Sequence, residues 1–331
     1  MFETIAPLRR YRNSPGESAM KPRIHLIATG GTIAGASPSA TDTTDYRAGT
    51  LTIEALIASV PPLADLAELT TEQLYKLDSK DMTPRHWLGL ARAIEAAVAQ
   101  EHIDGVVITH GTDTLEESAF FADLVLTPDK PVVFTCAMRP ATALSPDGPM
   151  NLYNAVSVAC DPSAAGLGVL VVTNDRIHAA REVTKAHTQA VDAFISPDTG
   201  PLGWARPPLI THKPVRPIGH PVELQGISTL PRVDILFVTA GSSPDLLQAC
   251  IAAGARGIVL ALPGHASVPE SWKGPIAQLR NKGYPVIETS RTGAGPLTMS
   301  TEMSRTPTKA RIELMLELSI SDRTPPLGKA S

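Results

Sequence analysis

The sequence contains few cysteines, and no short spacing pairs any two of them. Only Cys136, Cys160 and Cys250 occur among 331 residues. Their separation does not match the patterns that hold a structural metal, and their odd number excludes a framework in which every cysteine forms an internal disulfide. We expect buried free thiols, which favour a reducing, cytoplasmic location.

Long apolar runs are missing as well. Runs such as residues 169–172 and 235–238 are far shorter than the roughly 18 apolar residues that indicate a membrane-spanning helix. No apolar stretch follows the basic residues near the start of the chain, as a secretory signal requires. We therefore expect no membrane association and interpret residues 1–20 as a flexible N-terminal extension.

The chain also lacks an excess of positive charge and has few aromatic residues. It carries 29 Lys and Arg against 33 Asp and Glu, a formal net charge of -4, which argues against a nucleic-acid partner. Aromatic residues make up 4% and hydrophobic residues 43% of the chain. This composition is typical of a compact protein rich in aliphatic strands and helices, and the length allows two domains.

The sequence does contain a regular alternation of strand-like and helix-like segments. An amphipathic helix is predicted over residues 84–100, because Leu90 and Ile94 fall on one face and Thr83 before Pro84 is a start signal. Such alternation predicts a parallel sheet with helical crossovers. The predicted strands of the first half are residues 24–28, 106–109, 132–136 and 169–173.

The alternation resumes after a proline-rich segment. Residues 206–231 show no sustained periodicity and are predicted to form a linker. We therefore predict an α/β fold with two domains, a larger N-terminal parallel-sheet domain at residues 21–205 and a smaller C-terminal α/β domain at 232–331. The elements predicted in the second domain are strands at 233–239, 258–262 and 286–289 and helices at 245–253, near Ile276 and at 309–318.

A glycine-rich segment follows the first predicted strand directly and reads Thr-Gly-Gly-Thr at residues 29–32. Ligands of open α/β sheets bind at such carboxyl ends of strands. Gly30 and Gly31 allow a sharp turn, and they leave the Thr32 hydroxyl accessible beside backbone N–H groups. The spacing fits neither the dinucleotide fingerprint nor the Walker pattern. A catalytic loop and a simple tight turn are equally good interpretations of this segment alone.

A second polar segment follows the strand at residues 106–109 and begins His-Gly-Thr-Asp-Thr. Thr114 and Glu117 have the spacing of a capping box, which predicts that a helix begins there. Thr112 and Asp113 would then lie just before a helix N-terminus and face the same crevice as Thr32. Ordinary capping residues are the alternative, and they are favoured when this segment is taken alone.

Taken together, the two segments resemble the signature stretches of the bacterial-type L-asparaginase and glutaminase-asparaginase family. They match in order, in composition and in their flanking strands. The resemblance extends from about Ile24 to the last predicted helix, and it makes the domain at residues 21–205 the catalytic one. Shorter stretches that support it lie at residues 137–140, 147–149, 151–155 and 183–185.

The resemblance implies a nucleophile and a loop that covers it. Thr32 matches the family's attacking threonine, and Tyr46 matches a tyrosine on the mobile loop that follows. That loop would be residues 35–49 here. Its polar composition agrees, because long polar loops in compact domains are often covers of active sites.

A second catalytic group follows from the same resemblance. Thr112, Asp113 and Lys185 match the family's second polar triad. A threonine hydroxyl is a weak nucleophile until a base or a hydrogen-bond chain takes its proton, and Lys185 would serve in that proton relay. Asp113 would orient Lys185 or bind the ammonium group of the substrate.

The substrate-binding positions are also implied by the resemblance. Gly31 and Thr112 would offer backbone N–H groups, Ser79 would contact the substrate carboxylate, and Ala137 would offer its carbonyl to the leaving amide. Lys80 departs from the family's usual glutamine. This change places a cation beside the expected carboxylate and leaves open which amide is preferred.

The implied activity is hydrolysis of the side-chain amide of L-asparagine to L-aspartate and ammonia, through an acyl-enzyme on the threonine. No metal or organic cofactor is expected. The family forms homotetramers, built as dimers of dimers, in which a neighbour's C-terminal domain completes each site with a glutamate. Residues 291–306, which include Glu302, are shorter than in the family, and Ser267 stands where the family often has asparagine.

Three alternatives remain. A preference for L-glutamine or a D-amino-acid amide is compatible with Lys80. The asparaginase-like subunit of a tRNA-dependent amidotransferase is disfavoured, because the chain has no extra N-terminal domain and no basic patches. A sensor that binds L-aspartate without turnover would retain the fold, but the presence of Thr32, Thr112, Asp113 and Lys185 argues against it.

Overall fold

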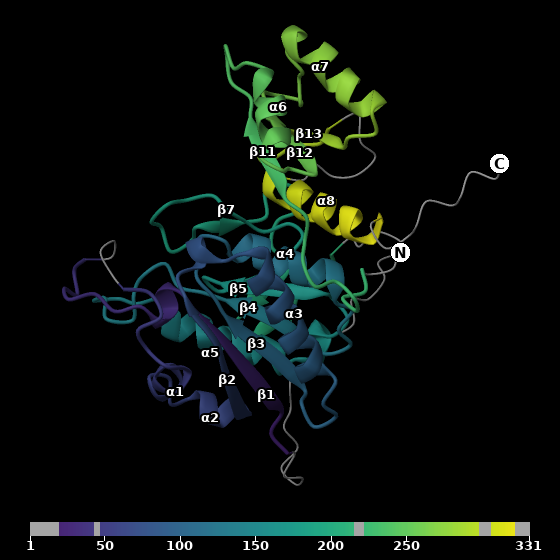
Figure 1. The fold of residues 1–331 in the computed structure, drawn as a ribbon. Coiled ribbons are helices and arrows are strands. Elements are labelled where there is room, and N and C mark those ends of the chain that lie inside the picture. The colour runs from purple at the N-terminus through teal and green to yellow at the C-terminus, as the bar shows by residue number, and fades with distance from the viewer. Residues whose placement is uncertain (1–19, 43–46, 215–221, 298–305, 322–331) are drawn as a thin grey trace, which may run out of the picture.

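The computed structural model describes residues 20–42, 47–214, 222–297 and 306–321. Two bodies are visible in Figure 1, a larger one built on an eight-stranded sheet and a smaller one built on a three-stranded sheet. Each sheet is combined with helices, which confirms the predicted α/β fold class. None of the helices within the described ranges is long and apolar enough to cross a membrane.

The larger sheet is parallel in its central part and antiparallel at one end. Strand β1 pairs in parallel with both β2 and β3, and the parallel pairing continues through β4 to β5. The strands beyond β5 are antiparallel. In spatial order the strands are β10 (Pro208–Ile210), β9 (Gly203–Ala205), β6 (Arg176–Ala179), β5 (Val169–Thr173), β4 (Val132–Thr135), β3 (Gly105–Thr109), β1 (Arg23–Gly30) and β2 (Glu68–Leu77).

Helices cover both faces of this sheet, which explains why its central strands are continuous apolar runs. One core contains Ile27 and Val106 together with α3 and α4, and the other contains Leu26 and Val107 together with α5. Neighbouring residues of one strand thus enter opposite cores. The helices of this body are α1 (Ile53–Ala58), α2 (Leu63–Leu66), α3 (Pro84–Val98), α4 (Leu115–Val125) and α5 (Gly148–Ala159).

The starts of α3 and α4 show where local signals suffice and where they fail. Thr83 begins α3 as predicted, and it forms a capping box with His86. The capping box predicted for Thr114 and Glu117 is wrong. Thr114 is the N-cap of α4, but its side chain makes no capping bond and instead donates to the Ser79 carbonyl at 2.7 Å. The Ser79 carbonyl, 35 residues earlier in the chain, thus takes the place of the predicted partner within α4.

The smaller body combines a parallel sheet with two helices of its own. Its strands are β11 (Val233–Phe237), β12 (Gly257–Leu262) and β13 (Val286–Ser290), and its helices are α6 (Asp245–Ala252) and α7 (Glu270–Asn281). The last helix, α8 (Pro307–Ser321), packs against both β12 and α4. Figure 1 shows α8 in yellow between the two bodies. The C-terminal end of the described chain therefore contacts the larger body directly.

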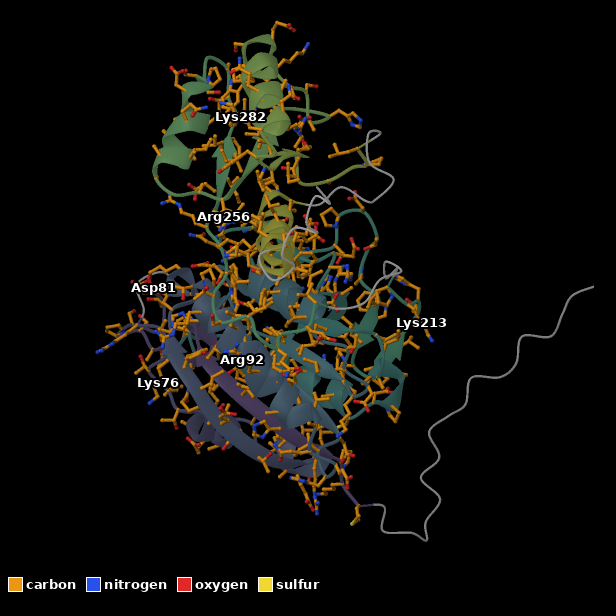
Figure 2. All side chains as sticks on the ribbon, turned by 45° about the vertical axis from the view of Figure 1, so that its right-hand side comes forward. Lys76, Asp81, Arg92, Lys213, Arg256 and Lys282 are labelled. Carbon is orange, nitrogen blue, oxygen red and sulfur yellow. The ribbon has the colours of Figure 1, made fainter. Side chains whose placement is uncertain are left out.

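The segment predicted as a linker includes an ordered strand. Strand β10 lies inside it and pairs with β9, because a hairpin with a short turn brings the two strands together. Further along the same segment, the Arg92 guanidinium on α3 donates to the Ile227 carbonyl at 2.5 Å, and Figure 2 labels Arg92 on the larger body.

The expectation that all three cysteines are buried is wrong. Cys136 is buried, whereas Cys160 and Cys250 are partly exposed.

Candidate active site

The order of the strands reverses direction next to β1, at one edge of the larger sheet. Strand β1 lies between β2 and β3, so the chain leaves β1 in one direction and returns on its other side. Open α/β sheets bind ligands at the carboxyl ends of strands that flank such a reversal. The loops after β1, β2 and β3 all begin at this edge. Figure 2 labels Asp81, at the end of the loop after β2, on the upper edge of the larger body.

These three loops interlock through backbone contacts. Gly31 has φ +79°, and a Cβ added there would overlap the backbone of Gly111. A Cβ added to Gly111 would in turn lie 2.6 Å from the Ser79 hydroxyl oxygen. The Gly31 N–H donates to the Leu77 carbonyl at 2.8 Å, which ties the loop to the end of β2. Glycine is required here because the loops approach more closely than side chains permit.

Thr32 begins a short 3-10 turn, η1 (Thr32–Ala34), immediately after the glycines. The residue is 4% exposed, and Leu51 N–H donates to the Ala34 carbonyl at 2.9 Å. The predicted cover of the site, residues 35–49, therefore starts at η1 and leads back to it. Its arms are joined by a bridge between Ala36 and Arg47. Tyr46, the predicted tyrosine of this cover, lies outside the described residues.

Lys185 forms the centre of a polar cluster with the loop after β3. Its ammonium group donates to the Thr112 hydroxyl at 2.9 Å and to an Asp113 carboxylate oxygen at 2.6 Å. The Lys185 side chain is 17% exposed and the Asp113 side chain 51% exposed. Three residues predicted to act together are thus brought into contact, although 72 residues separate Lys185 from Asp113. A cavity of about 430 Å³ opens beside Asp113 and Lys185.

Ser79 and Lys80 belong to η2 (Ser79–Asp81), the turn after β2, but they differ in burial. Ser79 is buried and its hydroxyl accepts the Asp113 N–H at 3.1 Å. Lys80 is 65% exposed and pairs with Asp78 at 2.5 Å. The predicted carboxylate contact is therefore part of the rigid interlock, whereas the adjacent cation extends into solvent with an anionic partner.

Ala137 is buried next to the Thr32 turn. A Cβ added to Gly148 would lie 3.0 Å from Ile33 and 3.3 Å from Ala137, which places both residues around the start of α5. The Asp147 carboxylate accepts the Met138 N–H at 2.9 Å and so fixes the loop that contains Ala137. Sequence reasoning assigned no role to Asp147, although its position directly before a helix N-terminus is a detectable signal.

His110 is a buried titratable group beside the site that sequence reasoning also passed over. Its Nδ1 lies 2.7 Å from the Gly111 carbonyl, so Nδ1 carries the proton of a neutral ring. Burial lowers the pKa of His110 to about 4, against the weaker raising effect of that hydrogen bond. The ring therefore stays neutral near pH 7 and fixes the Gly111–Thr112 peptide plane from behind.

Two family models match the chain on either side of residues 215–231. The model described as "Asparaginase, N-terminal" matches residues 23–214, and the model described as "Glutaminase/Asparaginase C-terminal domain" matches residues 232–325. Together they span most of the chain. It belongs to the asparaginase family.

Relatives of the chain bear names of the same family. It is 41% identical to L-asparaginase 2 of Bacillus subtilis over 92% of this chain and 85% of that protein. It is 40% identical to the glutaminase-asparaginase of Pseudomonas aeruginosa over 82% of this chain and 75% of that protein. A solved structure described as a probable cytoplasmic L-asparaginase from Campylobacter jejuni matches with a TM-score of 0.86 and 42% identity, over 90% of this chain and 95% of that one.

Two residues of the C-terminal domain, Ser267 and Glu302, were predicted near the site, and no contact to the N-terminal site residues is described for either. Glu302 lies outside the described residues. Ser267 lies in the loop after β12, where its N–H donates to the Pro263 carbonyl at 3.0 Å. Within this asparaginase-family chain, the described residues thus assemble the interlocked loops and the cluster around Lys185.

Proposed function

We propose that this protein is an L-asparaginase, which hydrolyses the side-chain amide of L-asparagine to L-aspartate and ammonia. The observation that carries the proposal is the contact of Lys185 with Thr112 and Asp113 beside the interlocked Thr32 loop. The relatives from Bacillus subtilis and Campylobacter jejuni support the same substrate.

In the proposed reaction Thr32 supplies the nucleophile. Its hydroxyl oxygen attacks the amide carbon and forms a tetrahedral intermediate, and its proton passes to the leaving nitrogen. Backbone N–H groups around Gly31 and Thr112 donate to the oxygen that becomes negative. Ammonia leaves, water attacks the resulting ester, and L-aspartate is released while Thr32 regains its proton.

The second polar group has two tasks in this proposal. Lys185 relays protons through the Thr112 hydroxyl, with which it is in contact. Asp113 neutralises Lys185 and, being half-exposed, has oxygen atoms available for the ammonium group of the substrate.

Three further residues bind or cover the substrate in this proposal. Ser79 binds the substrate carboxylate, and the Ala137 carbonyl accepts a hydrogen bond from the amide nitrogen that leaves. Tyr46 closes over the substrate with the loop at residues 35–49.

Ammonia release from L-asparagine tests the nucleophile. We expect Thr32→Ala to lower kcat by about 10³-fold or more, because the substitution removes the hydroxyl that the proposal makes the acyl acceptor. Thr211→Ala is the matched control, since Thr211 is an exposed threonine bonded to the Leu202 carbonyl at the far end of the sheet. Equal activity of the wild type and Thr32→Ala would refute the assignment of Thr32.

L-Glutamine is the second candidate substrate. The relative named glutaminase-asparaginase from Pseudomonas aeruginosa favours it, as does the cation at Lys80. A panel of L-asparagine, L-glutamine and their D-isomers, compared by kcat/KM, decides the order. Binding of L-aspartate without release of ammonia from any of these amides would instead identify a sensor.

We also propose a cytoplasmic homotetramer, a dimer of dimers. The Campylobacter jejuni relative, described as a probable cytoplasmic enzyme, and the free cysteines support the cytoplasm, and membership of the family supports the assembly. Light scattering at several concentrations measures the mass of the assembly, and fractionation of cells locates the protein. A monomer, or recovery from the periplasm, would contradict the corresponding proposal.

A further inference from the structure

The position of Lys185 is not set by the sheet that positions the rest of the site. Strand β7 (Thr184–Lys185) has two residues, and within the described part of the chain it pairs only with β8 (Phe194–Ile195), in a separate two-stranded sheet. Thr32 and Thr112, in contrast, lie two and three residues after β1 and β3, which are strands of the central sheet. So short a hairpin is marginally stable by itself. Other contacts must therefore hold Lys185 against Thr112.

Glu116 supplies the first of these contacts. It lies in the first turn of α4, three residues after Asp113, and one of its oxygens accepts both the Thr184 hydroxyl at 2.5 Å and the Lys185 N–H at 2.7 Å. The other oxygen accepts the Thr308 hydroxyl of α8 at 3.3 Å. A single carboxylate thus links the helix behind Thr112, the strand that carries Lys185, and the C-terminal helix.

Lys309 holds the same segment from the other side. Its ammonium group donates to the carbonyls of Arg181 and Val183, each at 2.7 Å. The residue is 2% exposed, and its ammonium group lies 5.5 Å from the centre of the Phe120 ring. Segment 181–185, which leads into Lys185, is therefore fixed by Glu116 at its end and by Lys309 at two carbonyls before it.

The location of Lys309 is not explained by a gain in stability, because burying its charge costs free energy. A buried ammonium group loses its hydration, and here it also lies in the first turn of a helix, where the macrodipole is positive. Burial lowers the pKa of Lys309 to about 8, with Glu116 and Glu182 acting in the opposite direction. An apolar side chain of similar volume would avoid these costs, but it would not hold the two carbonyls.

We propose that Glu116 and the first turn of α8, through Thr308 and Lys309, are positioning residues that hold Lys185 on Thr112 and Asp113. The inference rests on the proposed function for its kinetic test. It assigns the C-terminal helix a part in the active site of its own chain. The helix does not contact the substrate in this proposal. Lys309 acts through the carbonyls of segment 181–185, and Thr308 acts through the Glu116 carboxylate.

Lys309→Met gives the sharpest test, because it removes both hydrogen bonds to segment 181–185 while the side chain keeps a similar volume. The melting temperature should fall, since the two carbonyls lose their donor. We expect kcat for L-asparagine to fall on the order of 10-fold to 100-fold, with KM nearly unchanged, because Lys185 is displaced relative to Thr112. Lys273→Met is the control, since Lys273 is exposed on α7 and pairs with Glu270. If Lys309 had a purely structural role, Lys309→Met would have a lower melting temperature but an unchanged kcat per folded site.

A double-mutant cycle shows whether the effect passes through Lys185. In a Lys185→Met background, Lys309→Met is expected to cause no further loss of residual activity, since the displaced group is already gone. Glu116→Gln, which keeps one acceptor, is expected to lose less kcat than Glu116→Ala. Unchanged kcat in Lys309→Met, or an equal loss with and without Lys185, overturns the proposal.

Hydrogen exchange at the Lys185 amide tests the same contact without any turnover. We expect about tenfold faster exchange in Glu116→Ala and in Lys309→Met than in wild type, because local opening becomes easier. If the wild-type protein releases no ammonia from any amide, the proposed function fails while this measurement still decides the inference. Unchanged exchange in both variants refutes the positioning role.

Discussion

Ser79 and Lys80 are neighbours in sequence but differ in how firmly the fold holds them. Ser79 is buried and accepts a hydrogen bond from the loop after β3, whereas Lys80 extends into solvent beside Asp78. A buried hydroxyl gives a fixed contact, and a flexible ammonium group gives a long-range charge that solvent weakens. Binding and selectivity at this turn therefore depend on different residues.

Two opposite substitutions at this turn should change KM in opposite directions. Lys80→Gln removes a cation beside the proposed carboxylate site, so KM for L-asparagine should rise about two- to fivefold, the scale of an exposed ion pair. Asp78→Asn releases Lys80 from its partner and should lower KM. Steady-state kinetics in low and high salt measure both, and salt should reduce both changes. Identical KM values for the two variants would exclude Lys80 from substrate binding.

At the scale of elements, the candidate site depends on three loops that pack backbone to backbone. Gly31 contacts the backbone at Gly111, and Gly111 contacts the Ser79 side chain. Each loop follows a different parallel strand, so the sheet supports the contact from below. The spacing between these loops therefore depends on glycine at two positions.

Gly31→Ala should separate the loops. Its Cβ would overlap the Gly111 backbone at a positive φ, so we expect a destabilisation of about 3 kcal/mol and loss of activity. Gly166→Ala is the matched control, because Gly166 has φ +70° but nothing lies within 4 Å of an added Cβ. That variant should lose about 1 kcal/mol and keep its kcat. Urea denaturation measures both, and equal losses would show that the loop contact is unimportant.

At the scale of the whole molecule, two buried histidines connect stability to pH. His110 follows β3, and His178 lies on β6 with Nδ1 at 2.9 Å from the Ser196 hydroxyl. Burial lowers the pKa of each to about 4, and the Arg176 charge acts in the same direction on His178. The unfolded chain binds more protons between about pH 6.5 and pH 4, so the free energy of unfolding falls as the pH falls through this range.

His178→Gln should reduce this pH dependence. When the pH falls from 7 to 5, each histidine lowers the free energy of unfolding by about 2 kcal/mol. The decrease over this interval should therefore be about 2 kcal/mol smaller in the variant than in wild type. His102→Gln is the control, because His102 is exposed. Urea unfolding at the two pH values measures the difference. The same slope in wild type and His178→Gln would show that His178 is protonated without penalty in the folded protein.

Local patterns were sufficient for the central strands of both sheets and for several helices, but they did not predict β2 or α5. The predicted strands near Ile24, Val106 and Val259 are present because continuous apolar runs specify strands covered on both faces. The helix from Pro84 is present because a capping residue and an apolar face agree. One prediction that failed, the capping box at Thr114, concerns a side chain with two competing partners, and sequence spacing cannot rank them.

The sequence by itself determined the strand, the two glycines and the threonine at Thr32, because backbone freedom and strand burial are properties of neighbouring residues. Only the tertiary structure decided the position of Lys185. Its strand is too short to fix it, and Glu116, Thr308 and Lys309, the residues that hold it, come from distant parts of the chain. Contacts between residues so far apart depend on how the helices pack, and no local pattern encodes that packing.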